Sequence, residues 1–162
     1  MSVAIAPFYQ GWENYQQLLG KAIAPLTPEQ LNLAVAEHQW SVSVLVRHIV
    51  TARIGWFHNW MGEGGDEVNK FIEPVLWEDD PEAHPTASEL VQGLEITWQM
   101  INAALHRWTS DDMDQAFHNP WNPNRPDRSR QWIIWHVLEH DLHHGGEISL
   151  TLGTHHLAAI DL

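Results

Sequence analysis

Three histidines recur at four-residue intervals near the end of this chain: His136, His140 and His144. Residues four apart on a helix share one face, with Cβ atoms about 5–6 Å apart, so two neighbouring imidazoles can chelate one metal ion. The spacing alone is weak evidence, because chance placement of the chain's 12 histidines gives about one such pair, against two here. The cluster is stronger evidence than a single pair, because three imidazoles packed along one helix in a bundle interior would be costly to desolvate unless a partner such as a shared metal satisfied their lone pairs.

A metal bound here would need a further ligand from another helix. The chain has no cysteine, so imidazole and carboxylate are its only strong metal ligands. His48 is the only histidine near the middle of an earlier helical segment, beside an apolar stripe, whereas His58 lies nearer that segment's end. The other histidines fall in loops or near helix ends, where a solvated imidazole needs no metal: His38, His84, His106, His118, His155 and His156.

Two other metal-binding patterns can be compared with the sequence. A di-iron carboxylate bundle uses Glu-x-x-His on two helices, and no glutamate here precedes a histidine by three residues. The stretch from His136 to His140 does read H-x-x-E-H, the inverted zinc-protease motif. That fold would take a further acidic ligand well downstream, and only 22 residues follow His140. A protease is therefore the less favoured interpretation.

Four segments with a helical apolar period would position these histidines. They run over about residues 8–24, 41–61, 86–107 and 129–152. Ser41, Ser129 and a capping box from Thr86 to Glu89 predict three of the helix starts, and Gly153 predicts the last stop. No strand pattern of convincing length is present. The expected fold is an all-α, antiparallel four-helix bundle that forms a single domain over residues 1–162.

Composition limits the partners of such a bundle. Acidic residues outnumber basic ones by 21 to 8, so a nucleic-acid backbone would meet a like-charged surface and is not an expected partner. No stretch reaches the roughly 20 apolar residues that span a bilayer, and residues 1–7 lack the features of a signal peptide. We therefore expect a cytoplasmic protein without membrane association. Two long loops, containing Trp77 and Trp121, are expected to shape a pocket for a small-molecule substrate.

Two blocks of the sequence resemble the DinB-like superfamily. The early block, Ser41 to His48, reads SVSVLVRH, and the late block, His136 to Glu147, reads HVLEHDLHHGGE. The helix order and the total length are also similar. The family usually has arginine where this chain has Gly145, and two successive glycines weaken a helix by about 1 kcal/mol each relative to alanine.

The resemblance implies a four-helix bundle with one divalent metal bound by His48, His140 and His144. His136 and His143 would then be neighbours of the metal rather than ligands. Three neutral imidazoles leave coordination positions open, as catalytic sites do. Imidazole suits zinc, nickel and iron alike, so the metal's identity stays open.

The activities assigned to members of that superfamily include thiol-dependent transfer and isomerisation. The resemblance therefore implies a metal-dependent transferase that uses a low-molecular-weight thiol on a small electrophile, with no catalytic residue assigned. A bound metal would lower the pKa of a coordinated thiol or water. The alternatives are a metal-dependent hydrolase and a noncatalytic metal-binding or ligand-binding stress protein. A homodimer is one assembly open to such a chain.

Charged side chains near the histidines give two further hypotheses. A metal-bound histidine usually donates its other N–H to a carboxylate or carbonyl. Three carboxylates are therefore candidates to orient the imidazoles: Glu139, Asp141 and Glu147. Three arginines at the loop before the last helix are candidates to bind a carboxylate of a cofactor: Arg125, Arg128 and Arg130.

Overall fold

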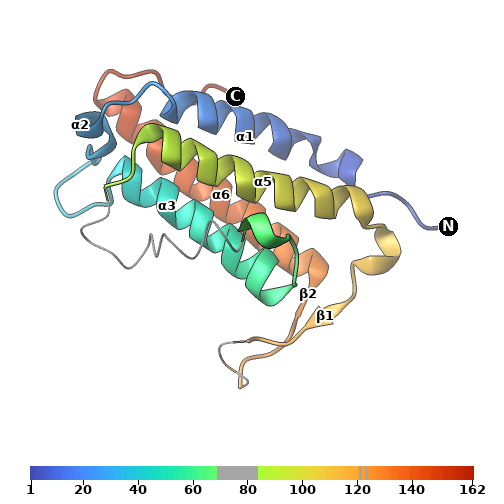
Figure 1. Cartoon of the computed structure of the whole chain (residues 1–162). Coiled ribbons are helices and arrows are strands. Elements are labelled where there is room, and N and C mark those ends of the chain that lie inside the picture. The colour runs from blue at the N-terminus through green and yellow to red at the C-terminus, as the bar shows by residue number, and fades with distance from the viewer. Residues whose placement is uncertain (69–83, 121, 123) are drawn as a thin grey trace.

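The computed structural model describes residues 1–68, 84–120, 122 and 124–162. This part of the chain is mostly helical, as predicted. Four long helical stretches lie side by side (Figure 1). They are α1 (Gln10–Ile23), α3 (Val42–Arg53) with its continuation as the π-helix η2 (Ile54–Trp60), α5 (Ala87–Arg107) and α6 (Arg130–Thr154). Trp77 and Trp121, which belong to the loops expected to shape a pocket, lie outside the described residues.

Short elements connect these helices. They are η1 (Ala6–Tyr9), α2 (Pro28–Leu31), η3 (Ser110–Asp112), β1 (Ala116–Phe117) and β2 (Arg128–Ser129). The two strands pair antiparallel, with Ala116 opposite Ser129. Two-residue strands carry no alternating pattern, which is why the sequence did not predict them.

The predicted helix starts are confirmed by their caps. The Ser41 side chain accepts a hydrogen bond from the backbone N–H of Val44, and the Ser129 side chain accepts one from Trp132. Thr86 and Glu89 form both hydrogen bonds of a capping box at the start of α5. Each bond satisfies a backbone donor that the first turn of a helix leaves unpaired.

The predicted stop of α6 at Gly153 is wrong. The helix runs through Gly153 to Thr154, and the left-handed residue that follows is His156, with φ of 59°. Backbone N–H groups close the end: His156 donates to Gly153 over 3.1 Å and Leu157 donates to Leu152 over 2.9 Å. This is the Schellman arrangement, which satisfies the last free carbonyls, with histidine in the place that glycine usually takes.

The helix directions differ in one respect from a strictly antiparallel bundle. Helices α1 and α6 run one way, and α3 and α5 run the other way (Figure 1). An ion pair between Glu63, just after η2, and Arg107, at the end of α5, is consistent with these directions, because it joins the C-terminal ends of the two stretches. Neighbouring α3 and α5 are therefore parallel. In the described part of the chain, no helix is long and apolar enough to cross a membrane.

Gly145 is required where the side chain of Tyr15 in α1 reaches α6. A Cβ atom at this position would lie 1.7 Å from the hydroxyl oxygen of Tyr15, whose ring is buried. The neighbouring Gly146 has no such contact, because a Cβ there would meet nothing within 4 Å. An arginine at position 145 would have no room opposite Tyr15.

We predict that alanine at these two glycines has opposite effects on stability. Gly145→Ala should lower the free energy of unfolding by about 1–3 kcal/mol, because Tyr15 or α1 must move. Gly146→Ala should raise it by up to about 1 kcal/mol, because alanine favours a helix interior over glycine. Urea denaturation followed by circular dichroism measures both. Equal stabilisation by the two variants would contradict the close approach of Tyr15 to α6.

Candidate metal centre

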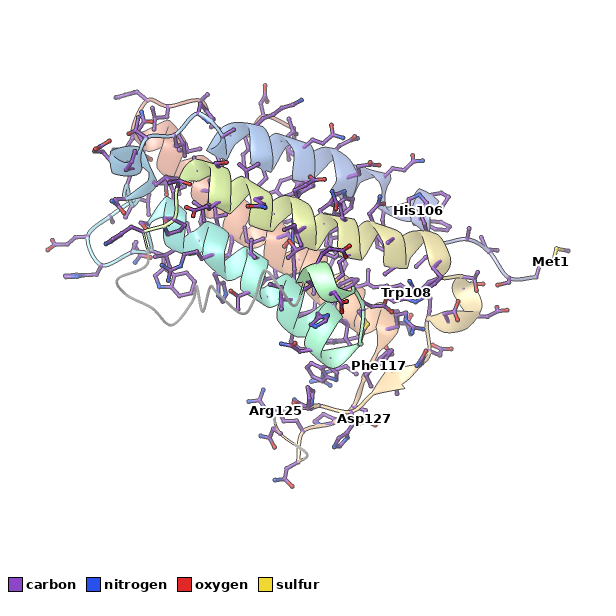
Figure 2. The ribbon with its side chains drawn as sticks, in the orientation of Figure 1. Met1, His106, Trp108, Phe117, Arg125 and Asp127 are labelled. Carbon is purple, nitrogen blue, oxygen red and sulfur yellow. The ribbon has the colours of Figure 1, made fainter. Side chains whose placement is uncertain are left out.

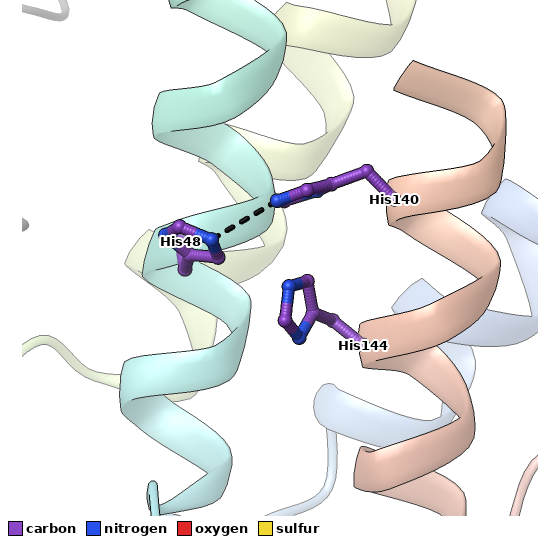
Figure 3. A group of neighbouring side chains, drawn as sticks. All are labelled: His48, His140 and His144. Carbon is purple, nitrogen blue, oxygen red and sulfur yellow. Dashed lines mark hydrogen bonds between the residues drawn. The ribbon is translucent and has the colours of Figure 1, made fainter. Parts of the chain in front are cut away.

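His48, His140 and His144 lie together between α3 and α6 (Figure 3). His48 comes from α3, and the other two come from successive turns of α6. Each offers one nitrogen, and the three nitrogens all lie within 4.8 Å of one another. The Nε2 atoms of His48 and His140 are 3.0 Å apart. Two nitrogens that bind one zinc-like ion at about 2.0–2.1 Å lie about 3–3.4 Å apart, so this spacing fits a shared metal.

The third imidazole is held by a carboxylate. His144 Nδ1 donates a hydrogen bond to Glu147 Oε2 over 2.6 Å. This places the proton on Nδ1 and leaves the lone pair of Nε2 to bind a metal. A carboxylate in this position fixes the tautomer and the ring orientation of a metal-binding histidine. Glu147 therefore occupies the place predicted for an orienting group, whereas Glu139 is exposed on the outer side of α6.

Burial favours the neutral, metal-binding form of the α6 histidines. Desolvation lowers the pKa of His140 to about 3, and repulsion from the neighbouring histidines, His144 first, adds to the effect. Desolvation also lowers the pKa of His144, against the opposing effect of Glu147. The buried Nδ1 of His140 has no hydrogen-bond partner within the described chain. Because a metal binds only unprotonated imidazole, these groups are ready to coordinate at neutral pH.

Two other histidines of α6 stand beside this group. The ring of His136 stacks on Trp132 at 4.8 Å and meets the edge of Trp56 at 4.7 Å, and its centroid is 6.3 Å from that of His140. The structure therefore does not bring the two histidines of the H-x-x-E-H stretch together as a ligand pair. The side chain of His143 is 67% exposed, and its Nε2 lies 4.0 Å from Glu147 Oε1.

A comparison with family sequence models identifies the family. The sequence model of the DinB superfamily matches residues 8–148. The chain belongs to the DinB superfamily. No curated protein matches this DinB chain.

Two solved structures share the DinB fold. A DinB-like protein from Bacillus cereus ATCC 10987 is 20% identical, covers 100% of this chain and 99% of its own, and superposes with a TM-score of 0.74. A conserved protein from Enterococcus faecalis is 16% identical, with 87% of this chain and 92% of its own covered, at a TM-score of 0.62. At these identities the likeness shows the fold alone.

Asp141, which was predicted to orient a ligand imidazole of this DinB chain, does not do so. Its side chain points into the core and forms an ion pair with Arg53, with Nη2 and Oδ2 2.7 Å apart and both side chains fully buried. The indole N–H of Trp12 also donates to Asp141 over 2.7 Å. Arg53 donates further to the side-chain oxygen of Gln16 and to the carbonyl of Leu94. The network joins α1, α3, α5 and α6.

The three arginines predicted to bind a cofactor carboxylate have different surroundings. Arg130 is buried and donates to the carbonyl of Asp112 over 2.6 Å and to Gln115 over 2.7 Å. It therefore holds the preceding loop in place, and the prediction is wrong for this residue. The guanidinium of Arg128 lies 4.5 Å from a tryptophan ring. Arg125 lies on the projecting end of the loop between β1 and β2, away from the helices (Figure 2).

Trp40 is a residue of the site that the sequence did not single out. It comes just before the cap of α3, and its ring lies 4.9 Å from that of His48 and 5.9 Å from that of His144. Its 48% exposure leaves much of the indole open to solvent. The sequence signal for Trp40 is its position directly before Ser41, which caps α3, and eight residues before His48.

We predict that protonation of His140 destabilises the metal-free protein in acid. The unfolded-state pKa is near 6.5 and the folded-state pKa is about 3, so between these values the unfolded chain binds a proton that the folded chain does not. This contribution is fully present above pH 6.5 and is lost as the pH falls toward about 3. His140→Gln should therefore show a smaller loss of unfolding free energy on acidification than the parent.

Denaturant titrations of the metal-free proteins between pH 7 and pH 4 measure this difference. His106→Gln is the matched control, because that side chain is exposed at the end of α5. A pH dependence of His140→Gln that matches that of the parent would remove the basis for a neutral, buried His140.

Proposed function

We propose that this chain is an enzyme that binds one divalent metal ion through His48, His140 and His144 and activates a low-molecular-weight thiol for transfer to a small electrophile. The observation that carries the proposal is the convergence of three imidazole nitrogens from two helices. In the described part of the chain, this group contains three ligands and no fourth. A structural zinc site fills four positions with protein ligands, whereas a catalytic site leaves one open. We also infer that the four long helices form the family's four-helix bundle.

A zinc, nickel or iron ion held there would supply the Lewis acidity that lowers the pKa of a coordinated thiol. The chain has no cysteine, so the thiol must come from a cofactor. Transfer would form a sulfur–carbon bond as the leaving group of the electrophile departs, with the thiol proton released to solvent. The residues of the chain have supporting tasks: Glu147 fixes the tautomer of His144, and Trp40 covers one side of the group.

Two measurements test this proposal in sequence. Elemental analysis of protein purified without a nickel column should find one divalent ion per chain, and an absence of metal would overturn the proposal. The loaded protein is then mixed with candidate thiols and a panel of small electrophiles, and the loss of free thiol is followed. Thiol loss that requires the metal supports a transferase. Turnover without thiol loss indicates a metal-dependent hydrolase, and metal binding without any turnover indicates a noncatalytic protein.

A further inference from the structure

A surface cavity of about 290 Å³ adjoins the histidine group at the start of α3 and the last turns of α6. It meets the group through one ligand candidate, His144. Its apolar wall is formed by Val35, Trp40 and Leu45, and Glu147 is the carboxylate in its lining. The cavity therefore adjoins the histidine group through His144, and its other lining residues decide what it can bind.

The loop that carries Trp40 is fixed at both ends. Ala34 and Ser41 form an isolated bridge, and the backbone N–H of Val42 donates to the carbonyl of Leu33 over 2.9 Å. The ring of His155, just after α6, contacts the carbonyl oxygen of Ala34 at 3.0 Å. The aromatic wall is thus held between α3 and the end of α6.

The charges and rings of the cavity favour a cation. The Glu147 side chain is 42% exposed. Its Oε2 accepts from His144, and its Oε1 lies 4.0 Å from His143 Nε2, beyond hydrogen-bond distance, so Oε1 can still face a ligand. Trp40, which is 48% exposed, lines the same cavity. Among the cavity's described lining residues there is no lysine or arginine, and the basic groups are the imidazoles of His38 and His144. An aromatic face combined with a carboxylate is suited to ammonium groups. The formal net charge of −13 also attracts cations.

The cavity's preference for a cation is set at a distance from the proposed metal. His144 faces Glu147 with Nδ1 and the other two histidines with Nε2, so the carboxylate and the metal position lie at opposite edges of one imidazole ring. His48 and His140 do not line the cavity. An ammonium group beside Glu147 is therefore separated from the metal position by the ring.

We propose that this cavity binds a small organic ammonium ion, with its charged group between Glu147 and Trp40 and its hydrocarbon part against Leu45 and Val35. The electrophile of the proposed reaction is then a small molecule that carries an amine. Only this last step rests on the proposed function, because occupancy of the cavity by an amine is measurable without metal.

Three probes of matched size test the charge preference. Benzylamine, benzyl alcohol and benzoate are titrated into the full chain, before and after metal removal, by isothermal calorimetry. Benzylamine is expected to bind about tenfold or more tightly than benzoate in both forms, with the alcohol between them. Benzoate that binds the metal-free protein as tightly as benzylamine, or no binding by benzylamine, would overturn the proposal. Either result would leave the proposed metal binding unaffected, because both can be measured on the metal-free protein.

Variants locate the binding. Glu147→Gln should weaken benzylamine about tenfold and leave benzyl alcohol nearly unchanged, and Trp40→Leu should weaken both, with Trp40→Phe retaining part of the affinity. Glu139→Gln is the matched control, because it removes the same charge from an exposed site two turns earlier on α6. Equal effects of the two glutamate variants would place the preference in the overall charge and refute the site. Circular dichroism shows that each variant is folded before titration.

Discussion

Alanine at His48, His140 or His144 is expected to abolish stoichiometric metal binding. Each residue supplies one of three nitrogens that lie within 4.8 Å of one another, so each variant leaves two ligands. The loss in affinity should exceed the ~10–100-fold that removal of an outer hydrogen-bond partner causes. Glu147→Gln provides that smaller effect for comparison, because it weakens only the bond to His144 Nδ1. Elemental analysis after dialysis measures the metal content of each variant, and competition with a coloured chelator measures its metal affinity.

Thermal unfolding gives an independent measure of the same prediction. A ligand that binds only the folded state stabilises it by about 2.7 kcal/mol at 100 times its dissociation constant. The parent should therefore melt at a higher temperature with added metal, and the three ligand variants should not respond. His136→Ala and His143→Ala should keep the response, because His136 stacks on Trp132 and His143 is mostly exposed. Loss of metal in His136→Ala together with retention in His48→Ala would instead support the H-x-x-E-H pairing.

The sequence predicted the helices and the candidate ligands because both depend on local signals. A helix cap involves a side chain and a backbone group three residues away, so Ser41 and Ser129 were sufficient to place two starts. The four-residue spacing placed three histidines on one face of α6 without ranking them. The resemblance to the DinB-like superfamily selected His140 and His144, and the structure shows why His136 differs: aromatic rings hold it away from the group.

The tertiary features could not be predicted in this way. Arg53 and Asp141 are 88 residues apart, and both residue types are usually exposed, so neither periodicity nor spacing pairs them. Gly145 looked like a weak point of a helix, and only the position of Tyr15 shows that a side chain cannot fit there. The parallel directions of α3 and α5 leave no pattern within the helices themselves, because the apolar period of a helix is the same in either direction.

Asp141→Asn is expected to be the most destabilising conservative substitution in this chain. The change leaves the guanidinium of Arg53 fully buried without its counter-ion, and the bond from the Trp12 indole to a charged oxygen is weakened. Breaking a buried ion pair by removing one partner costs about 3–5 kcal/mol, because the remaining charge stays uncompensated. Denaturant unfolding of the metal-free protein measures the loss. Asp127→Asn is the matched control, since its pair with His118 is largely exposed and should contribute at most about 1 kcal/mol.

A double variant separates the effect of the stranded charge from the effect of lost packing. Arg53→Met combined with Asp141→Leu removes both charges, so it should recover part of the stability lost in Asp141→Asn. Recovery should be incomplete, because Gln16 and the carbonyl of Leu94 lose the donor that Arg53 provides. Since Asp141 directly follows His140, the double variant should also bind metal more weakly than its stability alone explains. A double variant less stable than Asp141→Asn would show that hydrogen bonding, rather than charge compensation, holds the four helices together here.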